Sequence, residues 1–289
     1  MNSQLNGNKF VYRNGEQIGG ICVIAFNGEL DLKHVKLRLR GEAEVKWSKT
    51  KWVTSANDRQ SRIITYHQIL NFLTQDFDVT QTAKATKVER GVHRIAFVFH
   101  IPEDVPNSFK GNFGQIHYWI EAQIEKSLLS WNHETQTKFY LCSPLKAVNN
   151  APIVYRRLRD YCCCFIKRGS IDVEMSINEN SFNGGDSIAV SYDITNGRNF
   201  AIKMRATLVE KHIFKAHNNQ KDSTEKHIST EVPFIEAGKQ STGVIRVPIP
   251  ANARPSTKCP LIEAKYFVNI FIDDKSSGLE FNFPVIPFL

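Results

Sequence analysis

The chain has 289 residues, of which 42% are hydrophobic and 23% charged, enough apolar material for one large domain or two ordinary ones. Lys and Arg number 37 against 29 Asp and Glu, so the formal net charge of +8 favours anionic partners mildly. No apolar run reaches the ~18–20 residues of a membrane span, the first residues are too polar for a secretory signal, and six Cys are too few for a disulfide scaffold. We therefore expect a cytoplasmic protein.

The first strong pattern runs from Val35 to Trp47. Its odd positions read Val, Leu, Leu, Gly, Ala, Val, Trp, and its even positions read Lys, Arg, Arg, Glu, Glu, Lys. Such period-two alternation predicts a half-buried antiparallel strand, and the glycine at position 41 predicts a bend in it.

The same alternation recurs along the chain. Apolar stripes with a period of two begin at Ile95, Ile116, Ile171, Ile188, Ile202 and Ile262. Residues 48–62 and 74–90 lack the pattern and are predicted as loops. No helical stripe of two turns occurs, so many strands separated by turn residues predict an all-β protein built from β-sandwiches.

Two stretches in the second half repeat stretches of the first. Residues 11–18 and 181–188 both contain an aromatic residue, two turn residues, Gly, an acidic residue, any residue and Ile. Residues 99–102 and 118–120 match 247–250 and 266–268 at a single common offset. We infer two tandem domains, 1–146 and 167–289, joined by a basic, Cys-containing linker at 147–166.

The string from Ser108 to Trp119, S-F-K-G-N-F-G-Q-I-H-Y-W, is very similar to the signature S-F-K-G-x-[YF]-G-x-[IV]-x-Y-W of the alpha-arrestins. The segment from Val11 to Ile18 resembles the opening of the same family, and Cys162–Phe165 resembles the entry to its second domain. The resemblance covers about residues 9–289. It implies an arrestin fold of two immunoglobulin-like β-sandwiches.

The same resemblance implies a function. Alpha-arrestins are trafficking adaptors that bind membrane cargo and bring ubiquitin ligases to it. Members usually carry a tail with Pro-Pro-x-Tyr motifs that dock in the WW domains of the ligases. This chain contains no Pro-Pro pair, so we expect it to lack that tail motif and to reach a ligase only indirectly.

A row of basic residues in and beside the first long strand is the candidate binding site: Lys33, Lys36, Arg38 and Arg40. In an arrestin-like protein these side chains would bind phosphorylated or acidic tails of membrane proteins through charge-assisted hydrogen bonds. The competing interpretation is a solvated strand face, partly neutralised by Glu42 and Glu44. Nucleic acid is not an expected partner, because the nearby aromatic residues form no interleaved stacking platform.

Three consecutive cysteines, Cys162, Cys163 and Cys164, lie among basic residues. One hypothesis is reversible acylation with peripheral membrane association, since a single acyl chain needs adjacent basic charge for stable anchoring. The favoured alternative is that the thiols pack as small apolar groups where a strand begins. Metal binding is disfavoured by the missing C-x-x-C spacing.

No nucleophile elbow, P-loop, dinucleotide-binding glycine motif or zinc-protease motif occurs. We therefore predict a non-enzymatic protein with no cofactor, no metal and no catalytic residue. The predicted function is an adaptor that binds membrane-protein cargo at the plasma membrane or endosomes and affects its endocytosis, sorting or ubiquitination. The alternative is a scaffold or assembly subunit of a trafficking complex that does not grip cargo directly.

Overall fold

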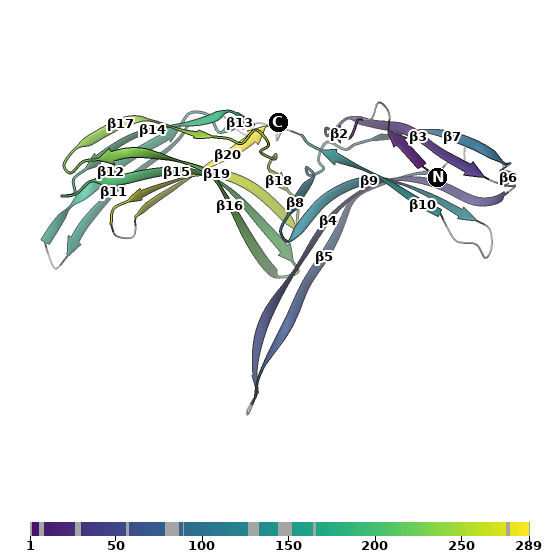
Figure 1. The fold of residues 1–289 in the computed structure, drawn as a ribbon, viewed down its shortest axis with the longest axis horizontal. Helices are drawn as coiled ribbons and strands as arrows, with labels where there is room; N and C mark the ends of the chain where they lie inside the picture. Colours follow the sequence, from purple (N-terminus) through teal and green to yellow (C-terminus); the bar gives the residue numbers. More distant parts are fainter. Residues whose placement is uncertain are drawn as a thin grey trace. The chain divides into compact units, whose positions relative to one another are not determined.

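The structure, a computed structural model, describes residues 2–5, 9–26, 30–55, 58–78, 87–88, 90–126, 133–143, 152–163, 166–275 and 278–288. Its regular structure in these ranges consists of β-strands, which confirms the all-β prediction. Nowhere in them is there a helix long and apolar enough to cross a membrane. The chain divides into two compact units (Figure 1), of which unit 1 comprises Met1–Ser143, Phe214–Lys221 and Thr257–Glu263, and unit 2 the remainder.

Unit 1 contains two sheets. The smaller one has the order β1–β3–β7, with β1 at Asn2–Leu5, β3 at Gln17–Phe26 and β7 at Gly91–His100. The larger one has the order β2–β10–β9–β4–β5, with β6 added on β4 and β8 on β9. Its strands are β2 Val11–Tyr12, β4 Leu30–Ser55, β5 Asp58–Asp78, β6 Lys87–Val88, β8 Phe109–Gly111, β9 Gly114–Lys126 and β10 His133–Leu141.

Unit 2 repeats this plan. One sheet has the order β11–β12–β14–β17, with β11 at Ile153–Cys163, β12 at Ile166–Ile177, β14 at Ser187–Asn196 and β17 at Gln240–Pro248. The other has the order β13–β20–β19–β15–β16, with β18 added on β19; residues 214–221 and 257–263 of these strands belong to unit 1. Its strands are β13 Ser181–Asn183, β15 Ile202–Ala216, β16 Asn219–Ile235, β18 Thr257–Lys258, β19 Ile262–Asp273 and β20 Leu279–Phe288.

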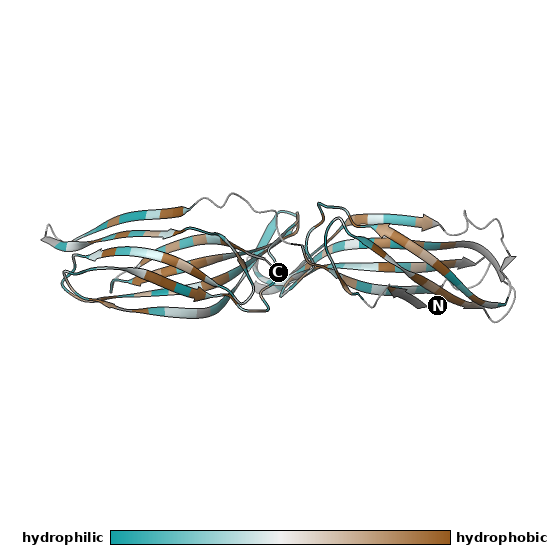
Figure 2. Ribbon diagram, turned by 90° about the horizontal axis from the view of Figure 1, so that it is seen from above, coloured by the Kyte–Doolittle hydropathy of each residue, from teal (hydrophilic) through white to brown (hydrophobic). Residues whose placement is uncertain are grey.

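Each unit buries the apolar face that the alternation predicted, and hydrophobic and hydrophilic residues alternate along many of the strands in Figure 2. In β4, Leu37 and Leu39 are fully buried, whereas Arg38 and Arg40 between and beside them are partly exposed. At the predicted bend, the register between β4 and β5 shifts, because β5 has one extra residue opposite Gly41 and Glu42. A Cβ atom at position 41 would lie 2.7 Å from the ring of Tyr118, so the close packing requires glycine. These buried stripes identify two sandwich cores of the predicted fold class.

The internal repeat is confirmed in backbone detail. β2 and β13 are both short strands that pair in parallel with the last strand of their unit, β10 and β20 respectively. Gly15 and Gly185 follow them in the left-handed conformation, with φ of 80° and 89°. Their amides donate to the carbonyls of Ile101 and Ile249, the very residues aligned by the second sequence match.

Two predicted loops are corrected by the structure. Within residues 48–62, Ser48–Ser55 belongs to β4 and Asp58–Arg62 to β5, and within residues 74–90, Thr74–Asp78 continues β5. Residues 48–52 and 61–62 are exposed on both faces of the strand pair, and Thr74–Asp78 lies on the edge strand β5, so the regular apolar alternation of a half-buried strand is missing. Hydrogen bonding between the two strands persists nevertheless.

The predicted linker is likewise mostly a strand. Ile153–Cys163 forms β11, which pairs with β12 from Ile153 opposite Ile177 to Cys163 opposite Ile166. β11 is an edge strand, and its inward-facing side chains include two arginines. Arg157 donates to the carbonyl of Glu280 in β20, and Arg159 donates to the carbonyl of Gly278, just before β20. Polar inward contacts explain why residues 153–163 lack the apolar pattern of a strand.

Candidate functional site: the charged face of the first sheet

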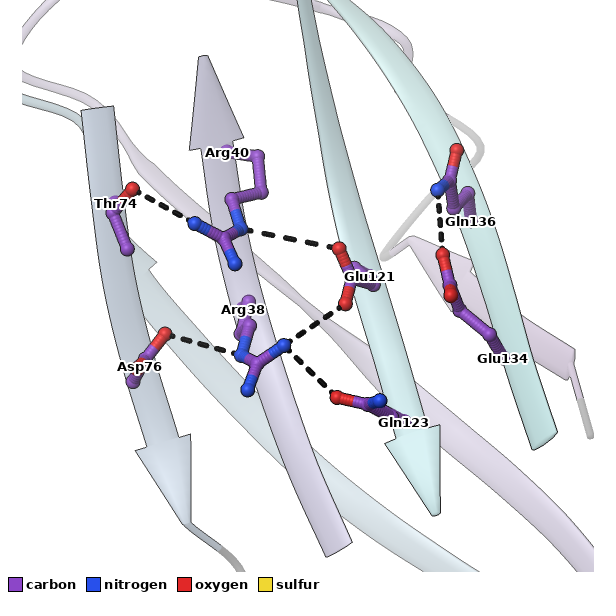
Figure 3. A network of polar contacts seen from close by, with 8 residues as sticks. All are labelled: Arg38, Arg40, Thr74, Asp76, Glu121, Gln123, Glu134 and Gln136. Atoms are coloured by element: carbon purple, nitrogen blue, oxygen red, sulfur yellow. Dashed lines mark hydrogen bonds and ion pairs between the residues drawn. The ribbon is translucent and has the colours of Figure 1, made fainter. Parts of the chain in front are cut away.

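The charged residues of β4 lie on the face of the larger unit 1 sheet opposite the core. Because successive side chains of a strand point to opposite faces, burial of Leu37 and Leu39 directs Lys36, Arg38 and Arg40 to the other face. β5 and β9 flank β4 here, so their side chains complete the surroundings of the two arginines. The close-up in Figure 3 shows the resulting network.

Arg38 contacts three side chains from the neighbouring strands. Its Nη1 donates to Oε1 of Gln123 at 2.9 Å and lies 3.2 Å from Oε1 of Glu121, both on β9. Its Nε lies 3.5 Å from Oδ1 of Asp76 on β5. The guanidinium therefore has one carboxylate on either side.

Arg40 is held by the same two strands. Its Nη1 donates to Oγ1 of Thr74 on β5 at 3.0 Å, and its Nε lies 3.9 Å from Oε2 of Glu121. Glu121 is a buried residue, with 9% of its surface exposed, and both of its oxygens face an arginine. A single carboxylate thus bridges the two guanidinium groups.

Because Glu121 bridges the two arginines, it limits how an anionic group of a partner could bind to them. Charge-assisted hydrogen bonds to a planar guanidinium are strong, and those of Arg38 and Arg40 are made inside the protein. A phosphate or carboxylate from a partner would have to displace Glu121 or share its arginines. This cluster, Arg38, Arg40, Glu121, Asp76 and Gln123, is called the arginine network below.

The acidic half of the same face is satisfied separately. Glu44 accepts from Gln115 at 3.1 Å and lies 3.0 Å from His67, and the hydrogen bond from Gln115 is the main reason why its pKa is lowered. Glu42 lies 3.9 Å from His117, whose ring stacks on Trp119 at 4.9 Å. Burial lowers the pKa of His117, so it contributes little positive charge near neutral pH.

The sequence therefore predicted the wrong partners for the basic row. Glu42 and Glu44 were the expected neutralising groups, but Glu121 and Asp76, from other strands, pair with the arginines. The alternation of β9 marked position 121 as outward-facing and polar; only the strand register, with Arg38 opposite Glu121, brings the groups together. Lys36 lies two residues before Arg38, on the same face of β4. Lys33 also lies in β4, but its side chain is outside the described residues.

The cysteine triplet ends β11. Cys162 is an exposed free thiol opposite Lys167, Cys163 is opposite Ile166, and Cys164 lies outside the described residues. Exposure of Cys162 does not agree with a thiol packed as a small apolar group. Acylation of the triplet stays a prediction.

A second polar cluster lies inside unit 2. Glu210 and His212 on β15 are 3% and 4% exposed, and Nε2 of His212 donates to Oε1 of Glu210 at 2.7 Å. Nε2 of His227 on β16 lies 3.3 Å from the other carboxylate oxygen. Burial alone would raise the pKa of Glu210, but the hydrogen bond and charge of His212, together with contributions from Tyr266 and Arg254, lower it. Across the described ranges, no group of three or more His, Cys, Asp or Glu residues could hold a metal ion.

Comparison with known proteins places both units in one family. The family profile for "Arrestin (or S-antigen), N-terminal domain" matches residues 1–147, and that for "Arrestin (or S-antigen), C-terminal domain" matches residues 167–286. The chain is 24% identical over 268 residues to the thioredoxin-interacting protein of Homo sapiens, covering 91% of this chain and 67% of that protein. It is 22% identical over 288 residues to arrestin domain-containing protein 17 of Caenorhabditis elegans, covering 93% and 66%. The chain thus spans about two thirds of the length of these relatives.

Proposed function

Since the chain belongs to the arrestin family, on its alpha-arrestin branch, we propose that it is a non-enzymatic cytoplasmic adaptor that binds acidic or phosphorylated segments of membrane-protein cargo. Through that binding it would affect the endocytosis, sorting or ubiquitination of the cargo. Proteins of this family generally act as adaptors. The observation that carries the proposal is the arginine network, which holds two partly exposed guanidinium groups on the sheet face opposite the core.

Binding would proceed by exchange of one anion for another. Arg38 and Arg40 are aligned by Glu121, and a partner's phosphate offers more acceptor oxygens and more charge than one carboxylate. The phosphate would take over one or both guanidinium groups while Asp76 and Thr74 keep them oriented. Glu121 therefore acts as an internal competitor, and removing its charge should favour the partner.

Fluorescence anisotropy with a labelled peptide carrying two phosphoserines tests this exchange on the full chain at ~0.15 M salt. The K36E/R38E/R40E variant should weaken binding by at least about tenfold, since charged hydrogen bonds contribute roughly 1.5–3 kcal/mol each. The Glu121→Gln variant keeps the shape of the side chain and should tighten binding several-fold. The control K226E/K239E/R246E makes the same change of net charge at exposed positions of unit 2 and should bind as the unaltered protein does.

Equal affinity of the unaltered protein and the K36E/R38E/R40E variant would remove these residues from the binding site. An unchanged affinity for Glu121→Gln would show that Glu121 does not compete. Thermal unfolding of each variant separates a loss of binding from a loss of fold.

The alternative function, a scaffold or assembly subunit, is favoured by the same internal ion pairs. Arginines that are already neutralised are compatible with a face that needs no anionic cargo. A stable stoichiometric complex in a pull-down, formed without cargo and unaffected by K36E/R38E/R40E, would favour this role.

A further inference from the structure

The strands β4 and β5 continue well past the sheet that contains the arginine network. β9 pairs with β4 only as far as Val45, opposite Gly114, whereas β4 and β5 stay paired to Ser55 opposite Asp58. In Figure 1 this part extends away from β9 as a two-stranded ribbon. We call residues 46–52 of β4 and 61–67 of β5 the outer ribbon.

The outer ribbon carries cations without counter-charges. Its sequences, K-W-S-K-T-K-W and S-R-I-I-T-Y-H, contain four Lys or Arg residues and no Asp or Glu. These cations, Lys46, Lys49, Lys51 and Arg62, are all exposed. Within the described part of the chain none of them has an ion pair, in contrast to Arg38 and Arg40 on the same strand.

Three of these cations crowd one face. Lys51 lies directly opposite Arg62, and Lys49, opposite Ile64, is diagonal to Arg62. Like charges directly opposite each other destabilise a strand pair. The repulsion is relieved when an anion lies against the ribbon, so this face is suited to an anionic partner.

The other face of the outer ribbon exposes apolar side chains. Trp52, opposite Ser61, is 60% exposed, and Ile63, opposite Thr50, is 74% exposed. The two side chains are diagonal neighbours on this face. Below them, the ribbon is stiffened by Trp47 stacked on Tyr66 at 5.4 Å, on the opposite face.

We propose that the outer ribbon docks on an anionic lipid surface. Trp52 and Ile63 would lie at the boundary between headgroups and acyl chains, where amphipathic Trp rings are favoured. Lys49, Lys51 and Arg62 would lie against the lipid phosphates. Lys and Arg side chains are long enough to reach past the edge of a two-stranded ribbon, so a ribbon that lies along the surface on its Trp52 face brings both sets of side chains to the interface.

Lipid fits this combination better than nucleic acid or an acidic protein segment. Charge alone would suit all three, but the most exposed apolar side chain, Ile63, contributes nothing to phosphate contacts or base stacking. An acyl boundary is the partner that favours both Ile63 and Trp52 as well as the cations. The proposal does not depend on the arginine network or on the cysteine triplet.

Flotation of the full chain with vesicles tests the proposal at ~0.15 M salt. The protein should float with vesicles of phosphatidylcholine containing about 30% phosphatidylserine and stay behind with phosphatidylcholine alone. The K49Q/K51Q/R62Q variant should partition about a hundredfold less, since each cation near an anionic membrane contributes about fivefold. The W52S/I63T variant should also lose partitioning while keeping its charge.

The K226Q/K239Q/R246Q variant is the matched control, because it removes three exposed cations of unit 2 and should float as the unaltered protein does. Three outcomes would overturn the proposal. The first is no flotation with phosphatidylserine vesicles. The second is flotation unaffected by both ribbon variants. The third is a ribbon that is needed for binding an oligonucleotide or a polyglutamate peptide but not for binding vesicles. Phosphopeptide anisotropy on the ribbon variants should be unchanged, which separates this result from the test of the arginine network.

Discussion

Glu210 is a nearly fully buried carboxylate inside unit 2. Its pKa lies below the usual 4.5, because His212 holds the ionised form in spite of burial. The folded state therefore binds fewer protons than the unfolded state in the acid range. The contribution of Glu210 to stability is fully present above about pH 4.5 and is lost as the pH falls through its lowered pKa.

Replacement of this carboxylate should reveal that contribution. Glu210→Gln should lower the free energy of unfolding of unit 2 by about 3 kcal/mol at pH 7, since it leaves buried imidazole donors without their carboxylate. The difference from the unaltered protein should shrink below pH 4.5. Denaturant unfolding followed by far-UV circular dichroism measures both effects, with exposed Glu225→Gln as the control; a difference that is constant with pH would contradict this account.

At the scale of elements, β11 is an edge strand that ties the two sheets of unit 2 together through side chains. Tyr155 and Arg159 donate to the carbonyls of Asn282 and Gly278 at 3.0 and 2.6 Å, in addition to the bond from Arg157. Arg159 also lies 3.6 Å from Asp274, a fully buried carboxylate that Tyr161 hydrogen-bonds as well. Burial and Asp274 raise the pKa of Tyr161 to about 12, which keeps its hydroxyl a donor.

The two faces of β11 provide a matched pair of substitutions. Arg159→Ala should lower the stability of unit 2 by about 2–4 kcal/mol, because it leaves buried Asp274 with less compensation. Arg156→Ala removes a side chain that is 76% exposed and paired with Glu174, so it should change stability by less than about 1 kcal/mol. Urea denaturation of both variants compares them, and equal losses would argue against a tie through Arg159.

For the whole molecule, unit 1 includes segments from distant parts of the sequence. Phe214, at the end of β15, is fully buried in this unit, with its ring centroid 6.2 Å from that of Phe109 and 5.7 Å from that of Phe113. Phe214→Ala should therefore destabilise unit 1 by about 3–5 kcal/mol. All four tryptophans precede residue 150, so their fluorescence follows unit 1 selectively during denaturation. Phe234→Ala, which truncates a 61% exposed ring, is the control, and equal shifts of the two midpoints would contradict the assignment.

Local patterns predicted the elements that have one buried face. The alternation around Leu37 and Leu39 is a consequence of the two-residue period of a strand, so it could be recognised without knowing the partner strands. It failed for residues 48–62 and 153–163 because these strands lack an apolar, buried face. Residues 48–52 and 61–63 of the outer ribbon are exposed on both faces, and β11 directs tyrosines and arginines inward.

The all-β class, the duplicated plan and the family could be recognised from the sequence alone, as could the face on which Arg38 and Arg40 lie. Each of these is marked by residues that are close together in the chain. Only the tertiary structure decided their partners. Glu121 is 83 residues from Arg38, and strand register, which no local pattern specifies, places the two groups 3.2 Å apart. The same pairing leaves Lys51 and Arg62 opposite each other without a carboxylate. The folded sheet therefore decides which basic residues are neutralised inside the protein and which remain accessible to an anionic surface.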